Sequence, residues 1–251
     1  MAQELPSGEY ENWAKCQQLL PHVELLFDSR PAAEEALKAW AQVLTNAAWY
    51  LWKQGSYSTA QQIVRKALAA RESVLGLDDG QTLRSVVVLA LVLQDQGKYE
   101  EAEKLHGQAL EGRKKELGER HPNTLTSMDN LAGLQQDQGK YKEAEKLNRQ
   151  ALEGWEKELG ERHPDTLTSV YCLAHLLHTL RRYTEAAELY QQACDGRTEQ
   201  LGFNHPHTVA CRNHFAAMQQ EEEQARSGER EDPYPVSIGL ATPVETCEKD
   251  I

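Results

Sequence analysis

Several residues in this chain have types and spacings that could support acid–base or metal chemistry. The phrase LGERHPDTLTSV begins at Leu159 and places His163 among acidic and hydroxyl side chains. A histidine within reach of a carboxylate is a frequent arrangement in general acid–base catalysis. His175 and His178 lie one helical turn apart, a spacing that metal ligands use and that could also form a wall whose charge changes near neutral pH. Each of these patterns also has a structural explanation.

Repetition of the His163 phrase argues against catalysis. LGERHPNTLTSM begins 42 residues earlier at Leu117, and a looser copy begins at Leu201, so that His121, His163 and His205 each precede a proline. A reaction needs its catalytic group once per protein, whereas a packing residue is needed once per structural unit. No nucleophile–base pair, metal constellation or cofactor fingerprint accompanies these histidines. We therefore predict that the protein is not an enzyme, with no catalytic residue, no cofactor and no metal site.

A period of 42 residues organises most of the chain. Four segments align in register, beginning at Gly55, Gly97, Gly139 and Arg181, and each has a tyrosine two residues later and alanines at matching positions. Within one unit, apolar residues follow steps of three and four, which place them on one face of an α-helix. Gly139 suits the left-handed end of one helix, and Pro164 suits the first turn of another. The pattern predicts one antiparallel pair of helices per repeat.

Helix pairs with this glycine, tyrosine and alanine spacing resemble tetratricopeptide repeats (TPRs). The longer period and the phrases LGERHPDTLTS, NLA from Asn130 and QGKYKEAEKL from Gln138 look more specifically like the kinesin-light-chain type. They resemble most closely the C-terminal arrays of fungal STAND-type (NACHT or NB-ARC) proteins. The resemblance covers residues from about 35 to about 222. It implies an all-α fold, a right-handed α-solenoid of antiparallel helix pairs (a TPR-like superhelix), with the NLA helix on its concave wall.

The register divides the chain into four repeats between two helical caps. We predict repeats at about 36–75, 78–117, 120–159 and 162–201, an N-terminal capping segment at 1–35, a C-terminal capping helix at 202–226 and a disordered acidic tail at 227–251. Pro21 should kink or divide the first cap. The tail contains prolines and many acids but no period, a composition typical of disorder.

Composition limits the classes of partner. A hydrophobic content of 40% with 26% charged residues is typical of a soluble, helix-rich protein. The net charge of -12 disfavours nucleic acid, because phosphates need a basic face. No apolar run approaches the roughly 20 residues that span a bilayer, and the first residues lack a secretory pattern. The scattered cysteines form no Cys-x-x-Cys pair, which favours reduced thiols. We expect a cytoplasmic protein that binds neither nucleic acid nor membranes.

If the helices stack as the resemblance implies, the first helix of each pair lines a peptide-binding groove. The register predicts these lining residues: Gln42, Thr45, Asn46, Trp49, Trp52, Lys53, Arg84, Val87, Leu91, Gln94, Asp95, Thr126, Asp129, Asn130, Gln136, Asp137, Tyr171, His175 and His178. Some family members grip a peptide's C-terminal carboxylate with cations and asparagines here, but only Asn130 matches that set. The acids and aromatic groups instead favour an extended or helical protein segment with apolar anchors and some basic residues.

Three interpretations of function follow. The leading one is a non-enzymatic scaffold for protein–protein interaction that binds a partner peptide or protein in the groove. A second is a freestanding sensing or regulatory module of a STAND-type NTPase system. A third is a small-molecule-binding or biosynthetic accessory protein, in which Trp49, Trp52, Tyr171 and the histidine pair would line a pocket. The sequence gives no indication of the oligomeric state.

Overall fold

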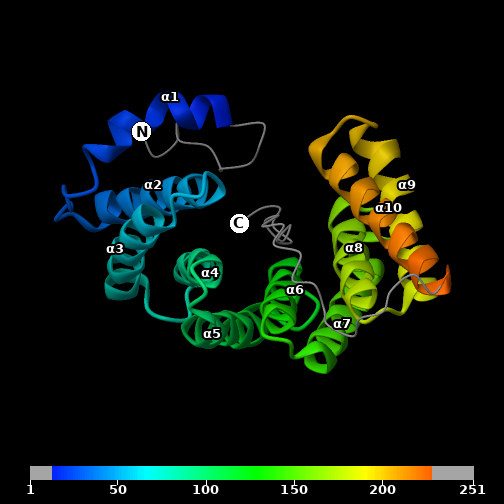
Figure 1. Cartoon of the computed structure of the whole chain (residues 1–251). Coiled ribbons are helices and arrows are strands. Elements are labelled where there is room, and N and C mark those ends of the chain that lie inside the picture. Colours follow the sequence, from blue (N-terminus) through cyan, green and yellow to red (C-terminus); the bar gives the residue numbers. More distant parts are fainter. Residues whose placement is uncertain (1–12, 228–251) are drawn as a thin grey trace. The chain divides into compact units, whose positions relative to one another are not determined.

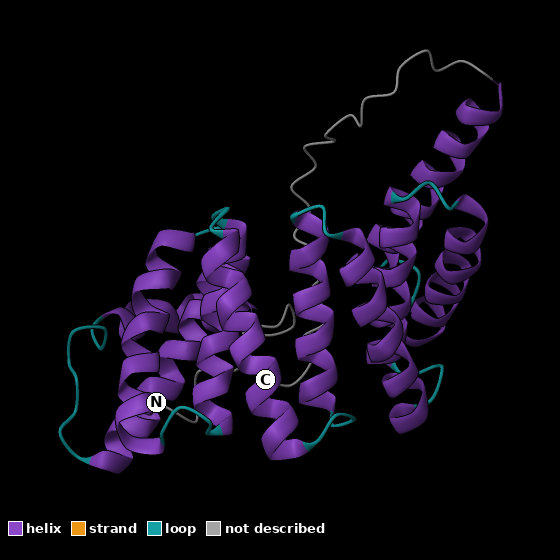
Figure 2. Cartoon of the chain, turned by 90° about the horizontal axis from the view of Figure 1, so that it is seen from below, coloured by secondary structure: helices purple, strands orange, loops and turns teal. Residues whose placement is uncertain are grey.

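The chain folds into helices connected by short turns. A computed structural model describes residues 13–227, and within these residues there are ten α-helices and no β-strand (Figure 1 and Figure 2). The predicted all-α fold class is therefore confirmed. The predicted acidic tail lies outside the described residues, apart from the serine that ends the last helix.

The helices belong to two compact units, which divide between Glu119 and Arg120. Unit 1 contains α1 (Trp13–Glu24), α2 (Glu34–Lys53), α3 (Tyr57–Leu75), α4 (Gly80–Asp95) and α5 (Tyr99–Leu117). Unit 2 contains α6 (Pro122–Asp137), α7 (Tyr141–Leu159), α8 (Pro164–Thr179), α9 (Tyr183–Leu201) and α10 (Pro206–Ser227). Each of the four predicted repeats corresponds to one helix pair, from α2–α3 to α8–α9.

Helix α1 continues through its proline. It is not divided at Pro21 but continues to Glu24. Cys16 and Val23, which lie on either side of the proline, both pack in one core cluster with residues of α2 such as Val43 and Ala47. Because both sides of Pro21 are anchored to the same neighbouring helix, tertiary packing offsets the lost backbone hydrogen bond.

The two helices of each pair approach closely because glycine and leucine face each other. A Cβ atom added to the glycine would lie 2.9, 2.4 or 2.6 Å from a leucine methyl carbon in the pairs Gly112–Leu83, Gly154–Leu125 and Gly196–Leu167. In the α2–α3 pair the register places Ala41 and Ala70 at these positions, and both are buried. At these positions each pair therefore has either two alanines or one leucine and one glycine. Both combinations fill the space between the helices.

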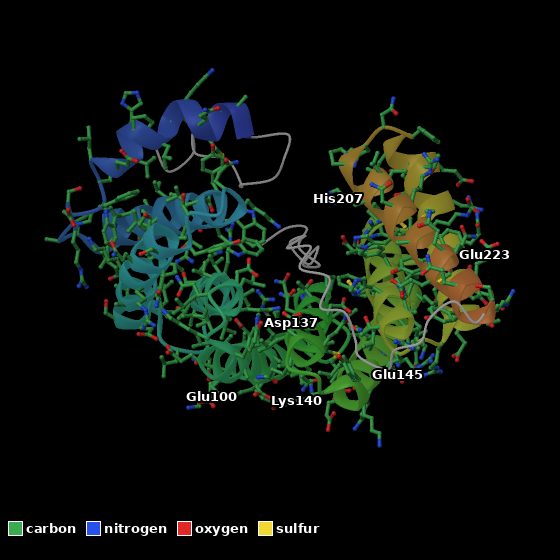
Figure 3. All side chains as sticks on the ribbon, viewed as in Figure 1. Glu100, Asp137, Lys140, Glu145, His207 and Glu223 are labelled. Atoms are coloured by element: carbon green, nitrogen blue, oxygen red, sulfur yellow. The ribbon has the colours of Figure 1, made fainter. Side chains whose placement is uncertain are left out.

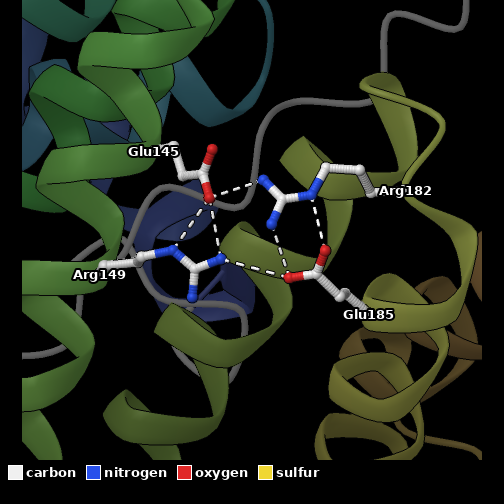
Figure 4. A network of polar contacts seen from close by, with 4 residues as sticks. All are labelled: Glu145, Arg149, Arg182 and Glu185. Carbon is white, nitrogen blue, oxygen red and sulfur yellow. Dashed lines mark hydrogen bonds and ion pairs between the residues drawn. The ribbon is translucent and has the colours of Figure 1, made fainter.

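Ion pairs add a polar connection between successive second helices. Glu145 of α7 accepts hydrogen bonds from Arg149 (2.9 Å) and from Arg182 (2.8 Å), which precedes α9 (Figure 4). Arg182 also bonds to Glu185, and Arg149 lies 3.5 Å from that carboxylate. Burial alone would raise the pKa of Glu145, but hydrogen bonds from the two arginines outweigh it and lower that pKa. The network therefore joins α7 to α9 as long as its carboxylates are ionised.

One turn contains a residue in an unfavourable backbone conformation. The turn inside each pair needs a positive φ, and Gly55, Gly97 and Gly139 supply it at +76°, +74° and +74°. The left-handed conformation predicted for Gly139 is confirmed. Arg181 has φ +59° at the equivalent place between α8 and α9. Its Cβ makes that conformation costlier than for glycine.

We predict that Arg181→Gly stabilises the protein. The glycine relieves strain of about 1 kcal/mol, partly offset by its greater freedom in the unfolded chain, so the melting temperature should rise by a few degrees. Differential scanning calorimetry measures the change. Arg181→Ala is the control, because it removes the same charge but keeps the Cβ. An equal increase for both variants would mean that charge, not backbone strain, is responsible.

Candidate functional site

The repeated His-Pro phrase has a structural role at helix starts. In α8 the ring Nδ1 of His163 accepts a hydrogen bond from the backbone N–H of Asp165 (3.2 Å), and Pro164 occupies the first helical position. His121 caps α6 in the same way, by accepting from the N–H of Asn123 (3.1 Å). Before α4 the cap is Asp79, whose carboxylate accepts two backbone N–H groups. Asp79, His121 and His163 occupy equivalent positions and accept backbone N–H groups in the same way. The two histidines are therefore helix caps.

In unit 1, side chains of α2 and α4 form one contact network. We call Gln42, Asn46, Trp49, Trp52, Lys53, Arg84 and Asp95 the α2–α4 cluster. The Asn46 Oδ1 accepts hydrogen bonds from Gln42 (2.8 Å) and from Arg84 (3.0 Å). Arg71 of α3 reaches the same network and donates to the Gln42 Oε1 at 2.6 Å. Burial, with repulsion from Arg84, lowers the pKa of Arg71 to about 10, so the guanidinium stays charged at neutral pH.

The other end of the α2–α4 cluster is aromatic. The Trp52 Nε1 donates to the Asp95 Oδ2 at 2.6 Å, which joins the two helices. The Lys53 ammonium lies 4.2 Å from the ring centroid of Trp52 and 5.0 Å from that of Trp49, distances that suit cation–π attraction. The Trp49 Nε1 is buried and has no hydrogen-bond acceptor within the described structure. Because Asp95 accepts the hydrogen bond from Trp52, it already has a partner inside the protein.

Several predicted groove residues lie in the core instead. Val87 and Leu91 are fully buried and Gln94 is buried, because α4 packs against α2, α3 and α5. Thr45 is buried too, with its hydroxyl bonded to Ala41 O (2.8 Å) and in contact with Ser85 (3.1 Å). In unit 2, Thr126 is buried and bonds to the Pro122 carbonyl. The prediction that these five residues line the groove is therefore wrong, because they belong to the core.

Asp129 requires a separate correction, since it was expected to attract a basic ligand. Its two carboxylate oxygens accept hydrogen bonds from the Trp155 Nε1 (2.8 Å) and the Ser169 hydroxyl (3.0 Å), and the residue is 5% exposed. A buried carboxylate needs such donors to offset its desolvation. Asp129 thus joins α6 to α7 and α8 from inside unit 2.

In unit 2, α6, α8 and α10 contribute a second group of side chains, most of which were predicted to line the groove. We call Asn130, Gln136, Tyr171, His175, His178, His214 and Glu221 the α6–α8–α10 cluster. Gln136 Nε2 lies 2.9 Å from the His175 Nδ1 and 3.4 Å from the Thr179 hydroxyl. The Tyr171 hydroxyl lies 2.6 Å from the His214 Nδ1, and the ring centroids of His175 and His214 are 5.5 Å apart. These contacts connect α6, α8 and α10, and Asn130 lies on α6 six residues before Gln136.

The electrostatic state of His175 differs from the expectation of a charge change near neutral pH. Burial lowers its pKa to about 4, and His214 and His178 act in the same direction. His175 is therefore neutral at neutral pH. Because the Gln136 Nε2 is a hydrogen-bond donor, the neutral ring accepts at Nδ1 and carries its proton on Nε2. His178 has a carboxylate partner, since its Nε2 lies 3.5 Å from the Glu221 Oε2.

His214 and Glu221 of α10 belong to this cluster but are not among the residues predicted from the sequence. The period could have found them, because His214 is in register with Asn46 and Asn130, and Glu221 is in register with Asp95 and Asp137. The predicted residue Asp137 ends α6 and is exposed (Figure 3). In residues 13–227, no group of three or more His, Cys, Asp or Glu side chains could hold a metal ion.

Asn130 has an environment unlike that of Asn46, its counterpart in α2. It is 3% exposed, and neither its Oδ1 nor its Nδ2 has a hydrogen-bond partner within the described part of the chain. A buried carboxamide without partners costs about 1–3 kcal/mol relative to a bonded one. A ligand group that reached this carboxamide with both a donor and an acceptor would remove that cost.

Comparison with known families is consistent with the helix pairs and their register. A tetratricopeptide-repeat model matches residues 81–157 and 130–199, and a second matches residues 40–80. Together these matches span more than half of the chain. The chain belongs to the tetratricopeptide-repeat family. TPR folds typically serve as scaffolds for protein–protein interaction. A search of curated proteins found no match.

Solved TPR structures resemble this TPR protein over most of its length. One, from Podosopora anserina, is described as kinesin light chain nearly identical TPR-like repeats; it has a TM-score of 0.62 and 25% identity, covering 79% of this chain and 92% of that one. BtubC (BKLC) from P. vanneervenii has a TM-score of 0.60 and 16% identity, with coverages of 90% and 94%. A Rap protein complexed with Competence and Sporulation Factor has a TM-score of 0.61 and 17% identity, with coverages of 86% and 63%. The resemblance to kinesin-light-chain-like repeats and the TPR-like fold are confirmed.

Among the described helices, none has both the length and the apolar character to cross a membrane.

We predict that His163→Ala lowers stability without affecting binding. Loss of the cap acceptor leaves a backbone N–H of α8 without its partner and should cost about 1 kcal/mol in the free energy of unfolding. Urea denaturation measures this cost. His163→Asp is the matched control and should retain most of the stability, because Asp79 performs the same task before α4. Loss of partner binding in a folded His163→Ala protein would contradict the structural role.

Proposed function

We propose that this TPR protein is a non-enzymatic scaffold that binds an extended or helical segment of a partner protein on the α6–α8–α10 cluster. The observation that carries the proposal is the buried, unpartnered carboxamide of Asn130. Gln136, which lies on the same helix as Asn130, and His175 of α8 are only partly buried. The cluster therefore combines an unsatisfied polar group with accessible ring and amide groups.

A peptide backbone matches the requirements of Asn130. Each peptide unit offers one N–H donor and one C=O acceptor, and a carboxamide can pair with both at once. A segment bound in this way would remove the desolvation cost that Asn130 carries in the unbound protein. Because a backbone contact is independent of sequence, specificity would come from the surrounding side chains.

We infer that the partner segment has apolar anchors and some basic residues. The imidazole of His175 is neutral, and its ring lies near those of Tyr171 and His178, so a ligand meets aromatic rings there. Acidic groups stand near the end of the same helices: Asp137 ends α6, and Glu221 of α10 contacts His178. Asp129 does not contribute to this preference, because Trp155 and Ser169 occupy its oxygens. A basic side chain would complement the remaining acids.

Selection of displayed random peptides on the full chain tests the proposal. We expect enriched sequences that contain apolar residues together with Lys or Arg. Asn130→Ala should weaken binding of the enriched peptides about tenfold, which corresponds to about 1.4 kcal/mol. Isothermal titration calorimetry measures the change in Kd.

Asn148 provides the matched control. It lies on α7 in the same repeat, it is 2% exposed, and its Oδ1 also has no hydrogen-bond partner within the described residues. Asn148→Ala should therefore change stability but leave peptide affinity unchanged. Equal affinities for Asn130→Ala and the wild type would show that the site is elsewhere. Enrichment of only acidic sequences without apolar anchors would contradict the inferred partner chemistry.

A further inference from the structure

Two cysteine thiols lie in direct contact where α9 meets α10. The Sγ atoms of Cys194 and Cys211 are 2.7 Å apart, and both residues are buried. A disulfide places its sulfur atoms about 2.0 Å apart, so only a small movement separates this arrangement from a covalent bond. The two cysteines are 17 residues apart in sequence and belong to different helices.

The pair departs from the repeat at both positions together. The places equivalent to Cys194 hold Leu68, Leu110 and Leu152, and those equivalent to Cys211 hold Ser85, Ser127 and Ser169. The helix-pair fold is therefore built three times in this chain with leucine and serine at these positions. Packing alone does not require two thiols where α9 meets α10.

Cys194 also borders a route to solvent. It lines a surface cavity of about 570 Å³ together with Asp195, Thr198, Phe203 and Arg212. The hydrogen bond with Cys211 lowers the pKa of the Cys194 thiol; burial opposes this, and the nearby Arg197 and Arg212 reinforce it. A small oxidant in the cavity is therefore next to Cys194, whose Sγ contacts a second thiol.

We propose that Cys194 and Cys211 are a peroxide-sensitive thiol pair, which oxidation converts to a disulfide between α9 and α10. The Cys194 thiolate attacks one oxygen of hydrogen peroxide; the O–O bond breaks, and hydroxide leaves and takes up a proton. The resulting sulfenic acid is attacked by the Cys211 sulfur, so that the S–S bond forms and the S–O bond breaks with release of a second water. Two thiols lose two electrons in total, and one peroxide is reduced to two waters.

The bond would fix the position of α10, which contributes His214 to the α6–α8–α10 cluster. His214 lies one turn beyond Cys211 on α10, and its ring contacts the Tyr171 hydroxyl of α8. A covalent tie to α9 would restrict separation of α10 from the α8–α9 pair. The modification itself does not depend on the proposed binding function.

Peptide mapping of the full chain tests this proposal. The protein is reduced, desalted, treated with a stoichiometric amount of hydrogen peroxide while folded, alkylated and digested without reductant. We expect a peptide pair that joins Cys194 to Cys211 and has lost two hydrogens. The melting temperature of the oxidised protein should exceed that of the reduced protein by several degrees.

Two variants separate the steps, and a third is the control. Cys211→Ser should stop the reaction at a sulfenic acid on Cys194, which dimedone traps, and Cys194→Ser should give neither product. Cys172→Ser should form the disulfide as the wild type does. Alkylation of both Cys194 and Cys211 in the peroxide-treated wild type would overturn the proposal, as would disulfides that join other cysteines instead. The wild-type mapping decides the matter even if a serine variant does not fold.

Discussion

The close approach of the two helices in each pair is the constraint on which the rest of the structure depends. Gly154 lies against Leu125 so tightly that even a methyl group would overlap the leucine side chain, and Gly112 and Gly196 repeat this arrangement. A TPR-like pair cannot bury its apolar face alone, and its stability comes from stacking on neighbours. The spacing within a pair therefore determines where the polar side chains of its first helix are placed.

This packing leaves the polar side chains of the first helices in two different hydrogen-bonding situations. Some connect helices internally, as Asp129 does with Trp155 and Ser169 and as Asn46 does with Arg84. Asn130 remains unpartnered in a buried position. Asn130 and Asn46 have the same side-chain type and the same register, so they differ in hydrogen-bond satisfaction alone.

Much of the fold could be predicted from the sequence because its signals are local. The 42-residue period, Gly139 at a left-handed turn and Pro164 at a helix start each depend on neighbouring residues, and the structure has each of them. The candidate site was less predictable, because it depends on contacts between helices. Val87 and Leu91 have the register of groove residues, yet three neighbouring helices bury them. The repeat could have indicated His214, but the lowered pKa of His175 follows from burial and from three histidines meeting in space.

A double-mutant cycle between Gly154 and Leu125 tests the central claim most directly. Alanine is the better helix former by about 1 kcal/mol, so a destabilising effect of Gly154→Ala would have to come from the contact with Leu125. We predict that Gly154→Ala lowers the free energy of unfolding by about 1–3 kcal/mol in the wild-type background. In the Leu125→Ala background, where space is available, the same change should be neutral or stabilising, so that the coupling exceeds about 0.5 kcal/mol. Additive effects, or stabilisation by Gly154→Ala in both backgrounds, would contradict the account.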